Sequence, residues 1–175
     1  MKKIKVFFLD RDGVLIKDTG YIKKINEIKF LKYTFQTLRF IKKEKFKIIV
    51  ITNQSAVGRG IITIRKLNLI NNFIKKKLKK KKAKIDDIYF CPHHPVHAKG
   101  IYKKKCKCRK PNNLLLLKAI NKWNIDIGKS FMIGDSVVDK IAAKKTKVKF
   151  FYRSKKNFYK QIKILLKKTK IICVV

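Results

Sequence analysis

The chain has 175 residues, of which 46% are hydrophobic, so it can bury one sizeable core but is too short for a multidomain machine or an array of large repeats. Its 48 Lys and Arg residues against 10 Asp and Glu residues give a formal net charge of +38, which on its own suggests nucleic acid or an anionic membrane as a partner. Only six of the basic residues are Arg, however, and Lys recurs at positions that helices and strands leave in solvent. We therefore interpret the charge as compositional bias and expect no specific nucleic-acid partner.

The start of the chain does not resemble a targeting segment. Met1-Lys2-Lys3 leads into a short strand-like run that meets an acid at Asp10, and no apolar run is long enough to span a bilayer. We expect a cytoplasmic monomer with no membrane partner, folded as a single domain over residues 1–175.

Short apolar runs alternate with longer amphipathic stretches along the chain. In chain order, we expect a strand at 4–9, a helix around 35–41, a strand at 47–52, a helix over 67–78, a strand at 88–90, a helix over 114–123, a strand at 131–133, a helix around 137–141, a strand at 148–152 and a helix over 158–166. This alternation predicts an α/β fold with a mostly parallel sheet. In such sheets ligands bind beyond the carboxyl ends of the strands.

Polar residues follow several of these predicted strands. They are Asp10 and Asp12 after the first strand, Thr52-Asn53-Gln54-Ser55 after the second, Arg109 and Lys110 on a later loop, and Gly134-Asp135 with Asp139 after the fourth. Each motif is common by itself, but their conjunction is far less expected by chance. Together they suit phosphoryl transfer. Asp10 would attack phosphorus, Asp12 would donate and then accept the proton, Thr52 and Lys110 would bind the phosphoryl oxygens, and Asp10, Asp135 and a backbone carbonyl would hold Mg²⁺.

These motifs resemble the four motifs of the haloacid dehalogenase superfamily of phosphotransferases. The resemblance runs through most of the chain and implies a three-layer Rossmann-like core that uses Mg²⁺. The chain is too short to carry a large cap domain besides that core, so loops would control access to the site.

A second cluster lies between residues 91 and 108, where three of the four Cys and all three His of the chain fall. A disulfide is an unfavourable interpretation for a cytoplasmic protein. Thiolates and an imidazole in pairs two residues apart suit a tetrahedral Zn²⁺ with no open position. We assign the ligands as Cys91, His93, Cys106 and Cys108, and we expect His94 and His97 to be exposed loop residues. The fourth Cys, Cys173, is expected to be packed in the apolar tail.

The Cys-x-His and Cys-x-Cys pairs narrow the resemblance to a zinc-bearing branch that contains heptose bisphosphate phosphatases and histidinol phosphatases. Asp18-Thr19-Gly20-Tyr21, the segment 52–60 and the long zinc loop are similar to the heptose enzymes. The resemblance implies removal of the 7-phosphate from D-glycero-D-manno-heptose 1,7-bisphosphate through an aspartyl phosphate, in the synthesis of lipopolysaccharide core precursors. It also implies Mg²⁺ binding through the Asp12 carbonyl, and a substrate site formed by Asp18, Thr19, Gly20, Tyr21, Asn53, Gln54, Ser55 and Arg109.

Several positions depart from the family pattern. Glycine is usual where Lys45, Ala56 and Asn113 stand, lysine where Ser136 stands, and an Ala-Gly turn where 144–147 stand. Loss of glycine from a turn that needs positive φ costs roughly 1 kcal/mol. Three alternatives remain open: a histidinol-phosphate phosphatase, a polynucleotide 3′-phosphatase, and a zinc-ribbon nucleic-acid binder without chemistry.

Overall fold

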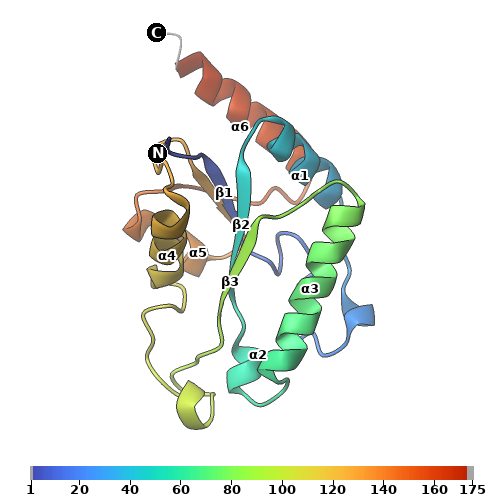
Figure 1. The fold of residues 1–175 in the computed structure, drawn as a ribbon, viewed down its shortest axis with the longest axis vertical. Helices are drawn as coiled ribbons and strands as arrows, with labels where there is room; N and C mark the ends of the chain where they lie inside the picture. The colour runs from blue at the N-terminus through green and yellow to red at the C-terminus, as the bar shows by residue number, and fades with distance from the viewer. Residues whose placement is uncertain (1, 173–175) are drawn as a thin grey trace.

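The computed structural model describes residues 2–172, in which a five-stranded sheet forms the central layer (Figure 1). All neighbouring strands pair in parallel, in the order β3-β2-β1-β4-β5. The strands are β1 (Val6–Leu9), β2 (Lys47–Asn53), β3 (Asp87–Cys91), β4 (Phe131–Gly134) and β5 (Lys149–Tyr152). The predicted α/β fold with a parallel sheet is confirmed, and within residues 2–172 no cap domain interrupts it.

Helices cover both faces of the sheet, which makes three layers (Figure 1). One face carries α1 (Thr34–Lys43), α3 (Ile64–Lys80) and α6 (Phe158–Ile172), and the other carries α4 (Leu114–Trp123) and α5 (Val137–Lys145). The alternation of side chains along β1 explains the two cores, because Phe7 and Leu9 pack on the first face while Val6 and Phe8 pack on the second. Three short helical segments complete the chain: η1 (Ile25–Glu27), α2 (Ser55–Gly58) and η2 (Gly100–Tyr102).

The helix predicted around 137–141 forms, but its large apolar residues do not make its packing face. Val137 and Ile141 are 61% and 38% exposed, whereas Asp139, Ala142 and Ala143 are buried. The helix approaches the sheet too closely for larger side chains, because a Cβ added at Gly134 would overlap the Asp139 side chain. Small residues and one acid therefore form the buried face.

Two of the turns that lack the family glycine do require positive φ. Lys45 has φ 61° and Lys147 has φ 60°, which side-chain-bearing residues adopt at a cost. Asn113 has φ −117°, so the expected strain at this position is not present.

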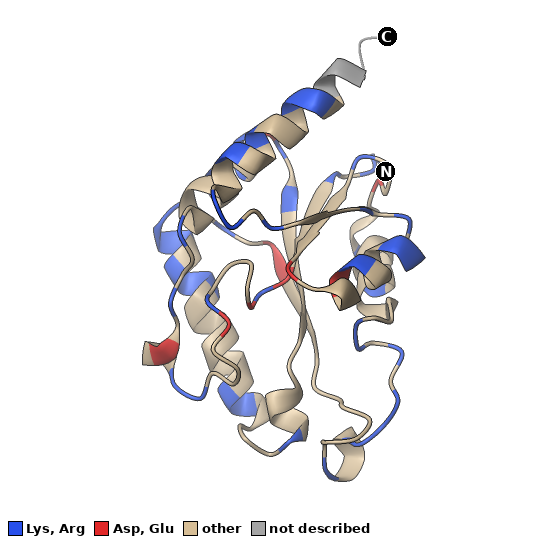
Figure 2. Cartoon of the chain, turned by 180° about the vertical axis from the view of Figure 1, so that it is seen from behind, with Lys and Arg blue, Asp and Glu red and all other residues tan. Residues whose placement is uncertain are grey.

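Basic residues are spread over the helices and connecting loops on both sides of the sheet (Figure 2). In the described part of the chain, no helix is both long and apolar enough to cross a membrane. Cys173 lies outside the described residues.

Candidate functional site

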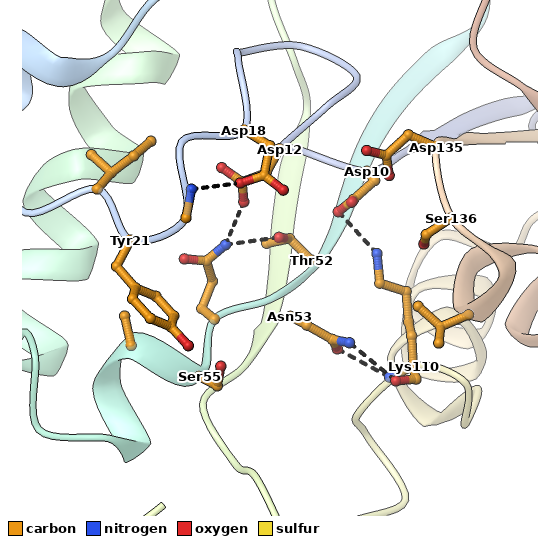
Figure 3. A pocket seen from close by; sticks show the side chains of 15 residues that line it. Asp10, Asp12, Asp18, Tyr21, Thr52, Asn53, Ser55, Lys110, Asp135 and Ser136 are labelled. Carbon is orange, nitrogen blue, oxygen red and sulfur yellow. Dashed lines mark hydrogen bonds and ion pairs between the residues drawn. The ribbon is translucent and has the colours of Figure 1, made fainter. Parts of the chain in front are cut away.

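The predicted catalytic residues converge at the carboxyl ends of three adjacent strands. Asp10 directly follows β1, Thr52 lies near the end of β2, and Asp135 directly follows β4. β1 lies between β2 and β4 in the sheet, so the carboxyl ends of these three strands lie side by side. The strand order reverses at β1, and ligands bind at such a switch point in parallel sheets. A cavity of about 230 Å³ opens here (Figure 3).

Lys110 links the acids of this site, as Figure 3 shows for its contact with Asp10. Its side chain is 2% exposed, and its Nζ lies 2.9 Å from Asp10 Oδ1 and 2.6 Å from Asp139 Oδ1. The same ammonium donates a hydrogen bond to the Ile51 carbonyl oxygen at 2.8 Å. A buried cation is thus held between two carboxylates by three contacts.

Burial and the opposite charges act against each other in this pair, and burial prevails for Asp10 only. Desolvation raises the pKa of Asp10 to about 7, although the neighbouring Lys110 ammonium opposes this shift. Burial also disfavours the charge on Lys110, but the carboxylates of Asp10 and Asp139 outweigh it and raise the pKa of the lysine. The lysine therefore carries its charge where a phosphate dianion would lie.

Three carboxylates form a group that could hold a hard cation. Oxygen atoms of Asp10, Asp135 and Asp139 all lie within 4.8 Å of one another. Burial, and then the charge of Asp139, raises the pKa of Asp135, which a nearby divalent cation would reverse. Gly13 has φ 73°, and a Cβ there would overlap the Asp135 carboxylate, so only glycine lets the first loop approach this acid.

Asp12 faces a different set of partners. Both of its carboxylate oxygens contact Arg11, with Nε donating to Oδ2 at 3.1 Å and Nη2 donating to Oδ1 at 3.0 Å. Gln54 Nε2 donates to Asp12 Oδ2 at 2.8 Å and to Thr52 Oγ1 at 2.9 Å. Gln54 therefore joins the proposed acid-base residue to the proposed phosphate-binding hydroxyl.

Asn53 positions the backbone of the lysine. Its Nδ2 donates to the Lys110 carbonyl oxygen at 3.0 Å, and its Oδ1 accepts from the Lys110 N–H at 3.0 Å. This double hydrogen bond fixes the loop that carries Lys110 to the end of β2.

Most of the residues predicted for the substrate site line the same cavity. The lining includes the five residues Asp18, Gly20, Tyr21, Asn53 and Ser55, together with the almost fully buried Gln54. Thr19 and Arg109 are not among the lining residues. Arg109 is turned aside, with Nη1 donating to the His93 carbonyl oxygen at 3.2 Å.

The predicted zinc ligands also come together. Ligand atoms of Cys91, His93, Cys106 and Cys108 lie within 4.8 Å of one another. Cys91 Sγ is 3.8 Å from Cys106 Sγ, close to the separation of about 3.8 Å that Zn–S bonds of about 2.3 Å produce in a tetrahedron. His93 Nδ1 lies 3.5 Å from the sulfurs of both Cys91 and Cys108.

The cluster differs from the prediction in one respect, since the sulfurs of Cys106 and Cys108 approach each other as a disulfide pair. A disulfide and a four-ligand metal site use the same two sulfurs and so exclude each other. A disulfide alone would not explain why the buried Cys91 and the half-buried His93 also converge on this point. His94 and His97 lie outside this group of four; His97 is exposed and His94 is half-buried, and His94 Nδ1 accepts from the backbone N–H groups of Val96 and His97 at 3.2 and 3.1 Å.

The loop that carries this cluster is docked on α2. Lys99 N–H donates to the Gly58 carbonyl oxygen at 2.8 Å. A Cβ at Gly58 would lie 2.5 Å from the Pro92 carbonyl oxygen, so the loop and the helix touch through backbone. The loop in turn leads to Arg109 and Lys110.

Sequence reasoning missed Arg11 and Asn71 as site residues. Arg11 is 3% exposed and contacts Asn71 of α3, 60 positions away in sequence. The available signal was composition, because arginine is rare in this lysine-rich chain and stands between the two predicted catalytic acids.

Comparisons with known proteins show which family the chain belongs to. The sequence model of the family described as "Polynucleotide kinase 3 phosphatase" matches residues 5–169. The D-glycero-beta-D-manno-heptose-1,7-bisphosphate 7-phosphatase of Pasteurella multocida is 38% identical over 145 residues, which are 83% of this chain and 78% of that protein.

Solved structures share the fold. A HAD-like phosphatase of Mesorhizobium loti is 25% identical, with a TM-score of 0.79 over 83% of this chain and 70% of that chain. The D,D-heptose 1,7-bisphosphate phosphatase of B. bronchiseptica, solved with magnesium and phosphate, is 22% identical, with a TM-score of 0.77 over 94% of this chain and 99% of that chain.

Proposed function

Since the chain belongs to the D-glycero-beta-D-manno-heptose-1,7-bisphosphate 7-phosphatase family of the haloacid dehalogenase superfamily and is a phosphoric monoester hydrolase, we propose that it removes the 7-phosphate of a heptose 1,7-bisphosphate. The product would be heptose 1-phosphate, a precursor for the lipopolysaccharide core. The observation that carries the proposal is the buried Lys110 ammonium held 2.9 Å from Asp10, which pairs a nucleophile with the cation that a phosphate dianion needs.

Four side chains carry out the proposed reaction. Asp10 attacks phosphorus and forms an aspartyl phosphate, and Asp12 gives a proton to the departing sugar oxygen. Asp12 then takes a proton from the water that hydrolyses the intermediate. Lys110 and the Thr52 hydroxyl bind the phosphoryl oxygens while charge moves onto them.

The acids Asp10, Asp135 and Asp139 fit a magnesium ion, because their oxygens converge and outnumber the single lysine charge between them. Asp10 and Asp135 are the proposed side-chain ligands, with the Asp12 carbonyl as a third. An ion held there would supply positive charge to the phosphoryl group and would favour the ionised form of Asp10.

The sugar end of the substrate meets the rim of the cavity. Asp18, Gly20, Tyr21 and Ser55 offer polar groups there, and Gln54 also lines the cavity while it donates a hydrogen bond to Asp12. Thr19 and Arg109 do not line the cavity but are next in sequence to the lining residues Asp18 and Lys110. Arg109 would act on the remote phosphate after leaving the His93 carbonyl.

The cluster of Cys91, His93, Cys106 and Cys108 is proposed to hold a structural Zn²⁺. Three sulfurs and one imidazole within 4.8 Å support this assignment over a lone disulfide. Burial lowers the pKa of His93 and so favours the neutral imidazole that binds metals. The ion would fix the loop 91–108, which docks on α2 and leads to Lys110.

A polynucleotide 3′-phosphatase is the second candidate, favoured by the description of the matching family and by the charge of +38. The test is a phosphate-release assay with heptose 1,7-bisphosphate, histidinol phosphate and a 3′-phosphorylated oligonucleotide side by side. The heptose proposal expects kcat/KM for the heptose to exceed the other two by at least tenfold. Release from the oligonucleotide only would overturn it.

We also propose the domain organisation, oligomeric state and location of the enzyme. We expect one domain over residues 1–175 that works as a cytoplasmic monomer, without a specific nucleic-acid or membrane partner. The even spread of basic residues in Figure 2 supports a compositional origin of the charge.

A further inference from the structure

A buried arginine with no assigned task lies directly between the two acids of the first loop. Arg11 is 3% exposed and is the only residue, among those described, whose side chain contacts both oxygens of Asp12. An arginine fork fits a carboxylate in two places at once, which fixes the plane of the carboxylate as well as its position.

The guanidinium is itself anchored from elsewhere in the fold. Nη1 donates to Asn71 Oδ1 at 3.0 Å, and Nη2 donates to Gln54 Oε1 at 2.8 Å. Asn71 lies on α3 and is 6% exposed, so the anchor belongs to the helical layer. The Asp12 carboxyl is therefore held in place, through Arg11, by a residue of helix α3 and not by its own loop alone.

We infer that Arg11 is a positioning residue, which with Asn71 holds the Asp12 carboxyl in the orientation for proton transfer. The inference rests on the proposed function of Asp12. In the first step the Asp10 oxygen bonds to phosphorus, the bond from phosphorus to the sugar oxygen breaks, and the Asp12 proton moves to that oxygen. In the second step water bonds to phosphorus, the Asp10 bond breaks, and Asp12 takes the proton of the water.

Both steps depend on where the Asp12 oxygens point, so a misplaced carboxyl should produce a specific kinetic signature. An alkoxide leaving group needs the proton, whereas p-nitrophenolate leaves without one. Loss of Arg11 should therefore slow release of an alkyl alcohol strongly and release of p-nitrophenol weakly. The second step needs Asp12 with either substrate, so the aspartyl phosphate formed from the aryl substrate should accumulate.

The test compares Arg11→Met, Arg11→Lys and Asn71→Ala with wild type and with Asp12→Asn. The substrates are p-nitrophenyl phosphate and the alkyl phosphate that the wild type hydrolyses best in the release assay. We expect kcat/KM of Arg11→Met to fall by about 10²-fold on the alkyl phosphate and less than about tenfold on the aryl phosphate. A burst of p-nitrophenol should precede a slow steady state. Arg11→Lys should stay defective because lysine keeps the charge but not the fork.

Asn71→Ala keeps the inference testable if Arg11→Met does not fold, since it removes only the anchor and should give the same pattern more weakly. Ile70→Val is the matched control, because it trims a fully buried neighbour on the same helix and should lower stability without changing the ratio between substrates. Equal losses on both substrates in the Arg11 and Asn71 variants would overturn the inference. If Asp12→Asn itself shows no preference between substrates, the proposed role of Asp12 fails instead.

Discussion

Replacing Lys110 by Met tests the electrostatic centre of the site. The change keeps the apolar stem and removes an ammonium that is 2% exposed and lies 2.9 and 2.6 Å from Asp10 and Asp139. Asp139 is fully buried and, among the described residues, would keep the side-chain hydrogen bonds from Ser136 alone. Breaking a buried ion pair in this way costs about 3–5 kcal/mol.

This loss is large enough to measure directly. A chain of this size shifts its melting temperature by roughly 2–4 °C per kcal/mol, so we expect a fall of roughly 6–20 °C by circular dichroism without added metal. Turnover should fall by about 10²-fold or more, because a preorganised cation at the phosphoryl group is lost. Added Mg²⁺ should recover part of the melting temperature, since a second cation can neutralise the acids.

The matched control is Lys122→Met, which breaks an exposed ion pair to Asp87 at 2.9 Å, with the lysine 63% exposed. Solvent screens this pair, so both melting temperature and turnover should change little. If Lys110→Met melts as Lys122→Met does and keeps its turnover, the buried pair does not have the role described.

Three further predictions concern the loop, the sheet edge and a turn. Cys106→Ser should lose about one bound Zn per chain by elemental analysis and melt at lower temperature; zinc-free wild type that melts earlier in dithiothreitol would instead indicate the disulfide. Burial raises the pKa of Asp86, but the Ile48 N–H and the Lys42 ammonium lower it by more. Asp86→Asn should therefore cost ~1 kcal/mol of stability at pH 7. This stabilisation is present above the unfolded pKa of 3.8 and is lost as pH falls through the lower folded pKa. The difference in stability between wild type and Asp86→Asn should therefore vanish in denaturant titrations at acid pH. A difference that stays constant with pH would contradict this role of Asp86. Lys45→Gly should raise stability by up to ~1 kcal/mol in urea unfolding, since φ is 61° there, and a loss would show that the lysine is not strained.

The sheet and the catalytic acids could be predicted from the sequence because both depend on local patterns. Each strand is a short apolar run, and the position of Asp10 and Asp135 follows directly from where β1 and β4 end. The parallel order then brings these ends together without any knowledge of side-chain contacts.

Features that depend on distant contacts could not be predicted in this way. Apolar periodicity favours Val137 and Ile141 as the buried face of α5. The close approach of the helix to Gly134 instead selects small residues for that face. The task of Arg11 depends on Asn71 in another layer, and the part of Asn53 in holding Lys110 depends on a hydrogen bond across 57 positions. None of these contacts leaves a periodic signal in the sequence.

We propose that Asp10 is the nucleophile that removes the 7-phosphate of a heptose bisphosphate. The most direct measurement follows heptose 1,7-bisphosphate by ³¹P nuclear magnetic resonance with wild type and with Asp10→Asn, whose side chain keeps its size but loses its charge. We expect the signal of the primary phosphate at carbon 7 to disappear, the anomeric phosphate signal to remain, and Asp10→Asn to be slower by several orders of magnitude. Loss of the anomeric signal, or an Asp10→Asn variant that keeps a tenth of the rate, would contradict it.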